Sequence, residues 1–77
     1  MIGFYYELNS LQNAEYLCNL CNKYKDIIKV DVQYNTCTVD GCSRMGILML
    51  IGNTVIVHPI TDDIDSLDKF IKELNNL

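Results

Sequence analysis

Residues 9–24, with the sequence NSLQNAEYLCNLCNKY, connect a strand-like segment to the clearest amphipathic pattern in the chain. Apolar side chains recur here in steps of three and four, which places them along one side of a helix. They are Leu11, Ala14, Leu17, Cys18, Cys21 and Tyr24. Asn9 or Ser10 can cap the first turn, because their side chains accept hydrogen bonds from unpaired backbone N–H groups. The stretch therefore predicts a helix that begins near Leu11 and buries this stripe.

The start of this helix is a place where an anion could bind, because unpaired N–H groups and the helix dipole favour negative charge. Residues 10–15 contain no histidine, cysteine, aspartate or lysine that could act as a nucleophile. Glu15 adds a carboxylate to the same region and should repel an incoming anion. We therefore expect no covalent chemistry at this helix start.

The rest of the chain predicts four strands and two more helices. Alternating or continuous apolar residues predict strands over residues 2–8, 28–33, 36–40 and 54–58. Asn35 suits the hairpin turn between the second and third strands, since asparagine tolerates positive φ. Ser43 can cap a short helix from Arg44 to about residue 51. Pro59 should end the last strand.

The last predicted helix is capped by Thr61 or Asp62, and the aspartates at its start suit the helix dipole. Its expected buried stripe is Ile64, Leu67, Ile71 and Leu74, with Phe70 beside it. The element order is then strand, helix, strand, strand, helix, strand, helix, in a single domain over residues 1–77. Such a chain folds most simply as a two-layer α+β open-faced sandwich, with helices on one face of a four-stranded antiparallel sheet.

Charge and composition exclude several classes of partner. The chain has 77 residues and a net charge of −4, and its six basic residues are scattered. Nucleic acids and anionic membranes are therefore not expected partners. The longest apolar run, residues 47–51, is far shorter than the roughly 20 residues that span a bilayer. The start of the chain does not resemble a signal peptide, which predicts a cytoplasmic protein. No pattern calls for a cofactor.

The segment Val39-Asp40-Gly41-Cys42-Ser43-Arg44-Met45-Gly46, followed by apolar residues, resembles a segment of the HPr family. These proteins are small phosphocarriers of the bacterial sugar phosphotransferase system. The core of the match is Ser-x-Met-Gly directly after a predicted hairpin, and the order of elements is similar over nearly the whole chain. The resemblance implies the strand order 1-4-2-3, with three helices on one face.

Residues 11–15 depart from the family. The carriers open their first helix with Leu-His-Ala-Arg-Pro, and the histidine carries the phosphoryl group. Here Gln12 occupies the histidine position, Ala14 the arginine position and Glu15 the proline position. A carboxamide is too weak a nucleophile for phosphoryl transfer, and without arginine the phosphate loses a charge-assisted partner.

Glutamine at this position resembles Crh, a catabolite-repression regulator in the same family, although Crh retains the arginine and the proline. The leading hypothesis is a non-catalytic, HPr-like regulatory protein of the phosphotransferase system that binds protein partners, such as a regulator, a kinase or phosphotransferase-system proteins. One alternative is a phosphocarrier component of the phosphoenolpyruvate-dependent system with another acceptor. His58, the only histidine, precedes Pro59, and we interpret it as a structural residue at a strand end.

Two features of the second helix suggest regulation and binding. Ser43 either only caps the helix or is also phosphorylated by an HPr-kinase-like enzyme, which would add a charge of about −1.5 to −2 there. The helix is apolar nearly all round, so its residues cannot all face one core. The resemblance implies that this helix is a docking surface, with Gln12, Met45, Leu48 and Met49 as candidate partner-binding residues.

The four cysteines have the pattern C-x2-C-x15-C-x4-C, which is close to the spacing of some zinc sites. A small metal-binding domain is therefore a further alternative. However, Cys18 and Cys21 lie on the apolar stripe of the first predicted helix, and cysteine is often buried. We therefore interpret them as core residues and predict no metal.

Overall fold

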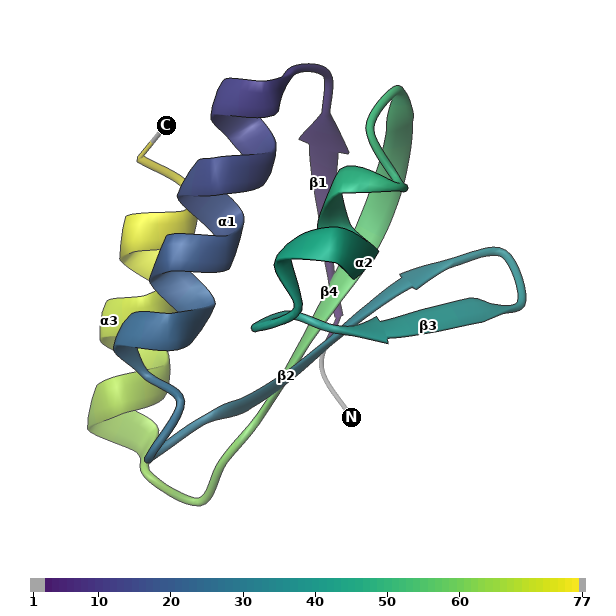
Figure 1. The fold of residues 1–77 in the computed structure, drawn as a ribbon. Helices are drawn as coiled ribbons and strands as arrows, with labels where there is room; N and C mark the ends of the chain where they lie inside the picture. Colours follow the sequence, from purple (N-terminus) through teal and green to yellow (C-terminus); the bar gives the residue numbers. More distant parts are fainter. Residues whose placement is uncertain (1–2, 77) are drawn as a thin grey trace.

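The structure is a computed structural model that describes residues 3–76. Its elements are β1 (Phe4–Leu8), α1 (Leu11–Lys23), β2 (Lys29–Tyr34), β3 (Cys37–Asp40), α2 (Arg44–Leu48), β4 (Asn53–Ile60) and α3 (Ile64–Leu74). The strands form one antiparallel sheet in the order β1-β4-β2-β3, and the helices lie together on one side of it (Figure 1). The predicted two-layer α+β sandwich with strand order 1-4-2-3 is confirmed.

Most element boundaries agree with the sequence pattern, and the differences have local causes. Ile2, the expected first residue of β1, lies outside the described residues. The helix expected to extend to about residue 51 ends at Leu48 in α2. β4 extends to Ile60 although Pro59 was expected to end it. The β1 partners of β4 extend only to Val57, so β4 continues beside β2 alone, where a residue without an N–H group is tolerated.

Side-chain caps begin all three helices. Ser10 Oγ accepts a hydrogen bond from the Asn13 N–H, and Ser43 Oγ accepts one from the Gly46 N–H. These two caps are as predicted. The cap predicted for the last helix was wrong, because Asp63 begins α3 by accepting from the Ser66 N–H. Thr61 instead donates its hydroxyl to the Ile27 carbonyl, which ties the loop before α3 to the loop after α1.

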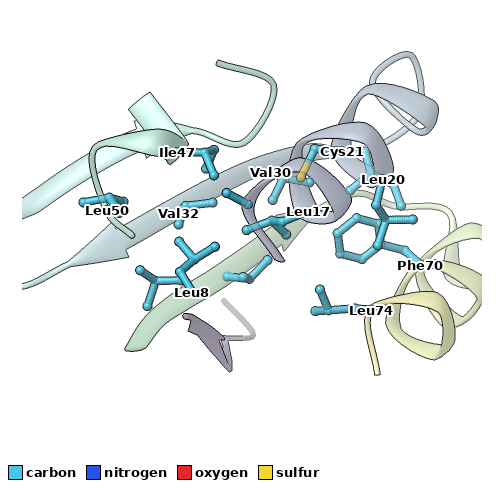
Figure 2. Close-up of a cluster of buried hydrophobic side chains, with 14 residues drawn as sticks. Leu8, Leu17, Leu20, Cys21, Val30, Val32, Ile47, Leu50, Phe70 and Leu74 are labelled. Carbon is cyan, nitrogen blue, oxygen red and sulfur yellow. The ribbon is translucent and has the colours of Figure 1, made fainter. Parts of the chain in front are cut away.

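The core lies between the helices and the inner face of the sheet (Figure 2). In α1, Leu20 is buried, whereas Leu11 is 55% exposed. The predicted stripe therefore omitted Leu20 and wrongly included Leu11. A helix that packs against one neighbour buries a single stripe of apolar side chains. α1 instead contacts the sheet, α2 and α3, and its Leu20 lies beside Phe70 of α3. The buried part of α1 is consequently wider than its periodicity suggests.

In α3 the buried residues are Phe70 and Leu74, while Leu67 and Ile71 are half-buried. Ile64, which the sequence pattern placed in the core, is 71% exposed. At about 100° per residue, Ile64 lies at the edge of the arc centred on Leu67 and Leu74. It is also the first residue of α3. Within residues 3–76, no helix combines the length and apolar character needed to cross a bilayer.

Candidate functional site

The candidate site is the surface where the start of α1 lies near α2. Gln12 is the second residue of α1 and is exposed. Side chains of the helix itself cap its start: Ser10 Oγ accepts a hydrogen bond from the Asn13 N–H and donates one to Asn13 Oδ1 at 3.0 Å. The group that projects at the expected phosphoacceptor position is therefore a carboxamide on a regular, internally capped helix.

An ion pair joins α1 to α2 beside this position. Arg44 Nη2 lies 2.5 Å from Glu15 Oε1, with 66% of the arginine side chain and 41% of the glutamate side chain exposed. Glu15 follows Gln12 by three residues, so the two side chains lie on neighbouring parts of the helix surface. Sequence reasoning placed Glu15 at the helix start, which was wrong: with Ser10 as the cap, Glu15 is the fifth residue of α1, and the first turn contains no acidic residue. Its partner was not predicted either. The two residues are 29 positions apart, and only the packing of α2 against α1 brings them together.

α2 exposes two of the three side chains that were predicted to bind partners. Met45 is 73% exposed and Met49, directly after the helix, is 80% exposed. Leu48 is half-buried and packs against the core, and the preceding Ile47 is fully buried. Ser43 is exposed at the start of this helix. Leu11 is a further exposed apolar residue at the start of α1 that sequence reasoning missed, because its spacing matched the buried stripe.

His58 lies within β4 rather than at a strand end, so that part of its prediction was wrong. Its Nε2 atom is 2.9 Å from Gln33 Oε1, and its buried Nδ1 atom has no hydrogen-bond partner among the described residues. Val55, Val57 and Pro59 of the same strand are buried under the helices, so His58 points to the other face of the sheet. The sheet therefore separates this imidazole from the start of α1.

The cysteines do not form one cluster. Cys18 and Cys21 are buried in α1, as predicted, whereas Cys37 is exposed and Cys42 is half-buried. The Cys18 thiol donates to the Cys42 carbonyl oxygen at 3.8 Å, and burial raises the pKa of Cys21 to about 12. Within residues 3–76, no three His, Cys, Asp or Glu side chains are grouped so that they could hold a metal ion. The structure therefore offers nothing in favour of the metal-binding alternative.

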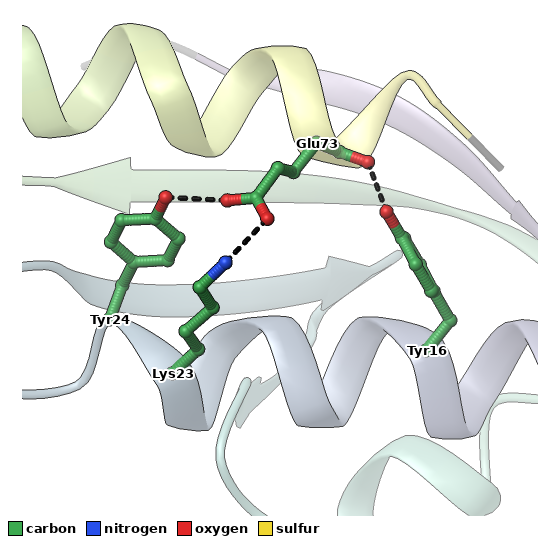
Figure 3. Close-up of polar contacts among 4 residues, drawn as sticks. All are labelled: Tyr16, Lys23, Tyr24 and Glu73. Carbon is green, nitrogen blue, oxygen red and sulfur yellow. Dashed lines mark hydrogen bonds and ion pairs between the residues drawn. The ribbon is translucent and has the colours of Figure 1, made fainter.

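A second polar cluster, centred on Glu73, holds α3 against α1 (Figure 3). Lys23 Nζ lies 2.6 Å from Glu73 Oε1, and the Tyr24 hydroxyl donates to Oε2 at 2.5 Å. The Tyr16 hydroxyl donates to the Glu73 backbone carbonyl. Hydrogen bonds from Lys23 and then Tyr24 lower the pKa of the Glu73 carboxyl, and the same contact with Glu73 raises the pKa of Lys23. The cluster positions the helix layer, and its Tyr16 lies one helical turn after Gln12 on α1.

The lowered pKa of Glu73 predicts a pH-dependent contribution to stability. Because the folded protein favours the ionised carboxylate, this contribution is present above the ordinary pKa of 4.5 and is lost as the pH falls through the lower folded value. We expect Glu73→Gln to be less stable than the wild type at pH 7, with a smaller difference at about pH 3. Urea unfolding followed by circular dichroism measures both.

Asp68→Asn is the matched control for this prediction, because it removes the exposed pair between Asp68 and Lys72 within α3. It should cost less stability at pH 7 than Glu73→Gln, since it breaks no contact between helices. A difference between Glu73→Gln and the wild type that stays constant from pH 7 to about pH 3 would contradict the assigned role of the carboxylate.

The strand order and the three helices on one face define an HPr-like open-faced sandwich. The chain is similar to the protein in the crystal structure of HPr-C-His from Thermoanaerobacter tengcongensis, with a TM-score of 0.73 and 24% sequence identity. The likeness covers 100% of this chain and 90% of that chain, and it shows the fold. Neither a family model nor a curated protein matches the sequence.

Proposed function

We propose that this chain is an HPr-like regulatory adaptor without enzymatic activity, which binds protein partners through the surface around Gln12 and α2 and does not carry a phosphoryl group at position 12 for transfer. The observation that carries the proposal is the exposed carboxamide of Gln12 on the first turn of α1 in an HPr-like fold. The family resemblance puts the phosphoryl-carrying histidine at this position. The proposal includes a cytoplasmic location and a role related to the phosphotransferase system.

The chemistry of the neighbouring side chains also disfavours a carrier. The carboxamide nitrogen lone pair is delocalised, so Gln12 cannot form a bond to phosphorus as an imidazole does. Ala14, at the family's arginine position, is buried and supplies no cation. Arg44 is the one guanidinium group in the chain, and it is paired with Glu15. A transferring phosphoryl group would therefore meet neither a nucleophile nor a free positive charge at Gln12.

Exposure supports the role of α2 in binding. Met45 and Met49 are large, flexible and mostly exposed, and methionine adapts to the shape of a bound surface. Leu48 is half-buried and would contribute only at the edge of such a contact. We propose that Gln12, Met45, Leu48 and Met49 contact the partner.

Binding can be tested with HPr kinase as the probe, by isothermal titration calorimetry. We expect Met45→Lys and Met49→Lys each to weaken binding by about tenfold or more, which corresponds to roughly 1.4 kcal/mol. Ile64→Lys is the matched control, because Ile64 is similarly exposed but lies at the start of α3. Equal weakening by all three variants, or unchanged binding in both methionine variants, would argue against this surface.

Ser43 phosphorylation is the proposed control of this surface. Ser43 is exposed, and its hydroxyl would receive the γ-phosphoryl group of ATP, with ADP as the leaving product. Incubation with ATP and HPr kinase should add one phosphate, measured by intact mass, to the wild type and to Ser10→Ala. Ser10 is the other exposed serine cap, and its removal controls for loss of a cap. Ser43→Ala should gain none, and a phosphate on that variant would refute the site.

A further inference from the structure

Arg44 is placed to interact with a group on Ser43 as well as with Glu15. It directly follows Ser43 in the chain and is the only lysine or arginine between residues 30 and 68. Its guanidinium reaches across to Glu15 on α1, with Nη2 and Oε1 2.5 Å apart. Because 66% of the Arg44 side chain is exposed, most of it is not held by packing contacts.

A phosphate on Ser43 would be surrounded mainly by negative charge. Asp40 ends β3 three residues before Ser43, and its Oδ1 atom accepts from the Cys42 N–H at 2.8 Å, while Glu15 lies opposite on α1. The charge of Lys25, after α1, also acts on the neighbouring Cys42. The α2 helix has only five residues, so its dipole offers little compensation. Arg44 is therefore the one cation that the phosphate's own segment supplies.

Charge decides which partner Arg44 prefers. A phosphate carries a charge of about −1.5 to −2 and three acceptor oxygens, against −1 for a carboxylate. Arginine can bind phosphate through two parallel charge-assisted hydrogen bonds, and Arg44 is next to Ser43 in the chain. In the unmodified protein no acidic group on α2 competes with Glu15 for the Arg44 guanidinium.

Building on the proposed modification of Ser43, we propose that Arg44 exchanges partners. It pairs with Glu15 when Ser43 is unmodified and with the phosphate when Ser43 is phosphorylated. The exchange breaks the ion pair between α1 and α2 and leaves the Glu15 carboxylate free beside Gln12. The charge of Glu15 is then no longer neutralised by Arg44, so the proposed docking surface becomes more negative.

The test uses protein made by chemical synthesis with phosphoserine at position 43, so that no kinase is needed. Phosphorus NMR follows the second pKa of the phosphate during a pH titration. Arg44→Gln should raise that pKa by about 0.3 unit or more, as expected for the loss of an exposed charge pair. Lys72→Gln, which removes a charge from a distant pair on α3, should leave it unchanged.

Competition with Glu15 is tested by a double-mutant cycle. Glu15→Gln removes a nearby negative charge and should lower the phosphate pKa in any case. The informative quantity is therefore how much this pKa shift differs between the protein with Arg44 and the Arg44→Gln background. We expect Glu15→Gln to have a larger effect when Arg44 is present than in the Arg44→Gln background. Additive effects, or no shift in Arg44→Gln, would overturn the exchange.

The kinase assay and this titration fail independently. A synthetic phosphoprotein that shows the coupled shifts, together with a Ser43 that the kinase does not modify, would remove the proposed regulation but leave the exchange of partners established. Modification by the kinase without coupled shifts would leave the regulatory proposal intact and refute the exchange.

Discussion

Incubation with phosphoenolpyruvate and enzyme I is expected to leave the mass of the wild-type protein unchanged, whereas a Gln12→His, Ala14→Arg variant gains an acid-labile phosphate. Gln12 is exposed, so an imidazole at this position would be accessible to a phosphoryl donor. Histidine forms covalent phosphoryl intermediates and a carboxamide does not. Position 14 is buried, and an arginine there would extend its apolar stem along the surface and place its guanidinium in solvent, as the charge-assisted partner that is missing there.

The variant should not include the family's proline at position 15. Glu15 is the fifth residue of α1, and its backbone N–H faces the Leu11 carbonyl in the helix. A proline there would remove that hydrogen bond, and its ring would clash with the Leu11 carbonyl. Glu15→Pro would also remove the partner of Arg44. The family's full Leu-His-Ala-Arg-Pro sequence therefore does not suit the helix as it begins in this chain, where Ser10 is the cap.

Intact mass before and after acid treatment measures the result, with Gln12→Asn, Ala14→Arg as the control that lacks a nucleophile. That control should gain no phosphate. An acid-labile phosphate on the wild type would refute the adaptor proposal and establish the alternative of a phosphocarrier with another acceptor. A Gln12→His, Ala14→Arg protein that folds but gains no phosphate would show that enzyme I does not recognise this surface.

The substitution Phe70→Ala is expected to lower the free energy of unfolding by about 3–5 kcal/mol. Phe70 is fully buried between α3 and α1, and its ring meets the Tyr24 ring edge-on at 5.8 Å between centroids. Alanine would leave a cavity and remove that contact. Because small domains have only about 5–15 kcal/mol of stability, this loss is a large share of the total.

Urea unfolding followed by circular dichroism measures the loss, and Ile64→Ala on the same helix is the control. Ile64 is mostly exposed, so its substitution should change the free energy of unfolding by less than about 0.5 kcal/mol. Similar losses in both variants would mean that Ile64 contributes as much as Phe70 to holding α3 in place, as expected if Ile64 belonged to the buried stripe. A loss well below 2 kcal/mol for Phe70→Ala would contradict the close packing at this position.

Features that depend on neighbouring residues were predicted well. Ser10 and Ser43 cap their helices, and Asn35 takes a φ of 54° in the hairpin turn. Each depends on contacts within about four residues, which the sequence lists in order. The strand order came from the family resemblance rather than from periodicity, because alternation identifies strands but does not pair them.

The sequence by itself determined which segments are helices and strands, where two helices begin, and that a carboxamide stands where the resemblance to HPr implies a histidine. Only the tertiary structure decided that Leu11 and Ile64 are exposed, that His58 lies on the far face of the sheet, and that Glu15 and Glu73 find partners on other helices. The physical reason is the distance along the chain over which each kind of interaction acts. Backbone hydrogen bonding and caps act between close neighbours in the chain, whereas burial and ion pairing depend on which distant element lies across from a side chain.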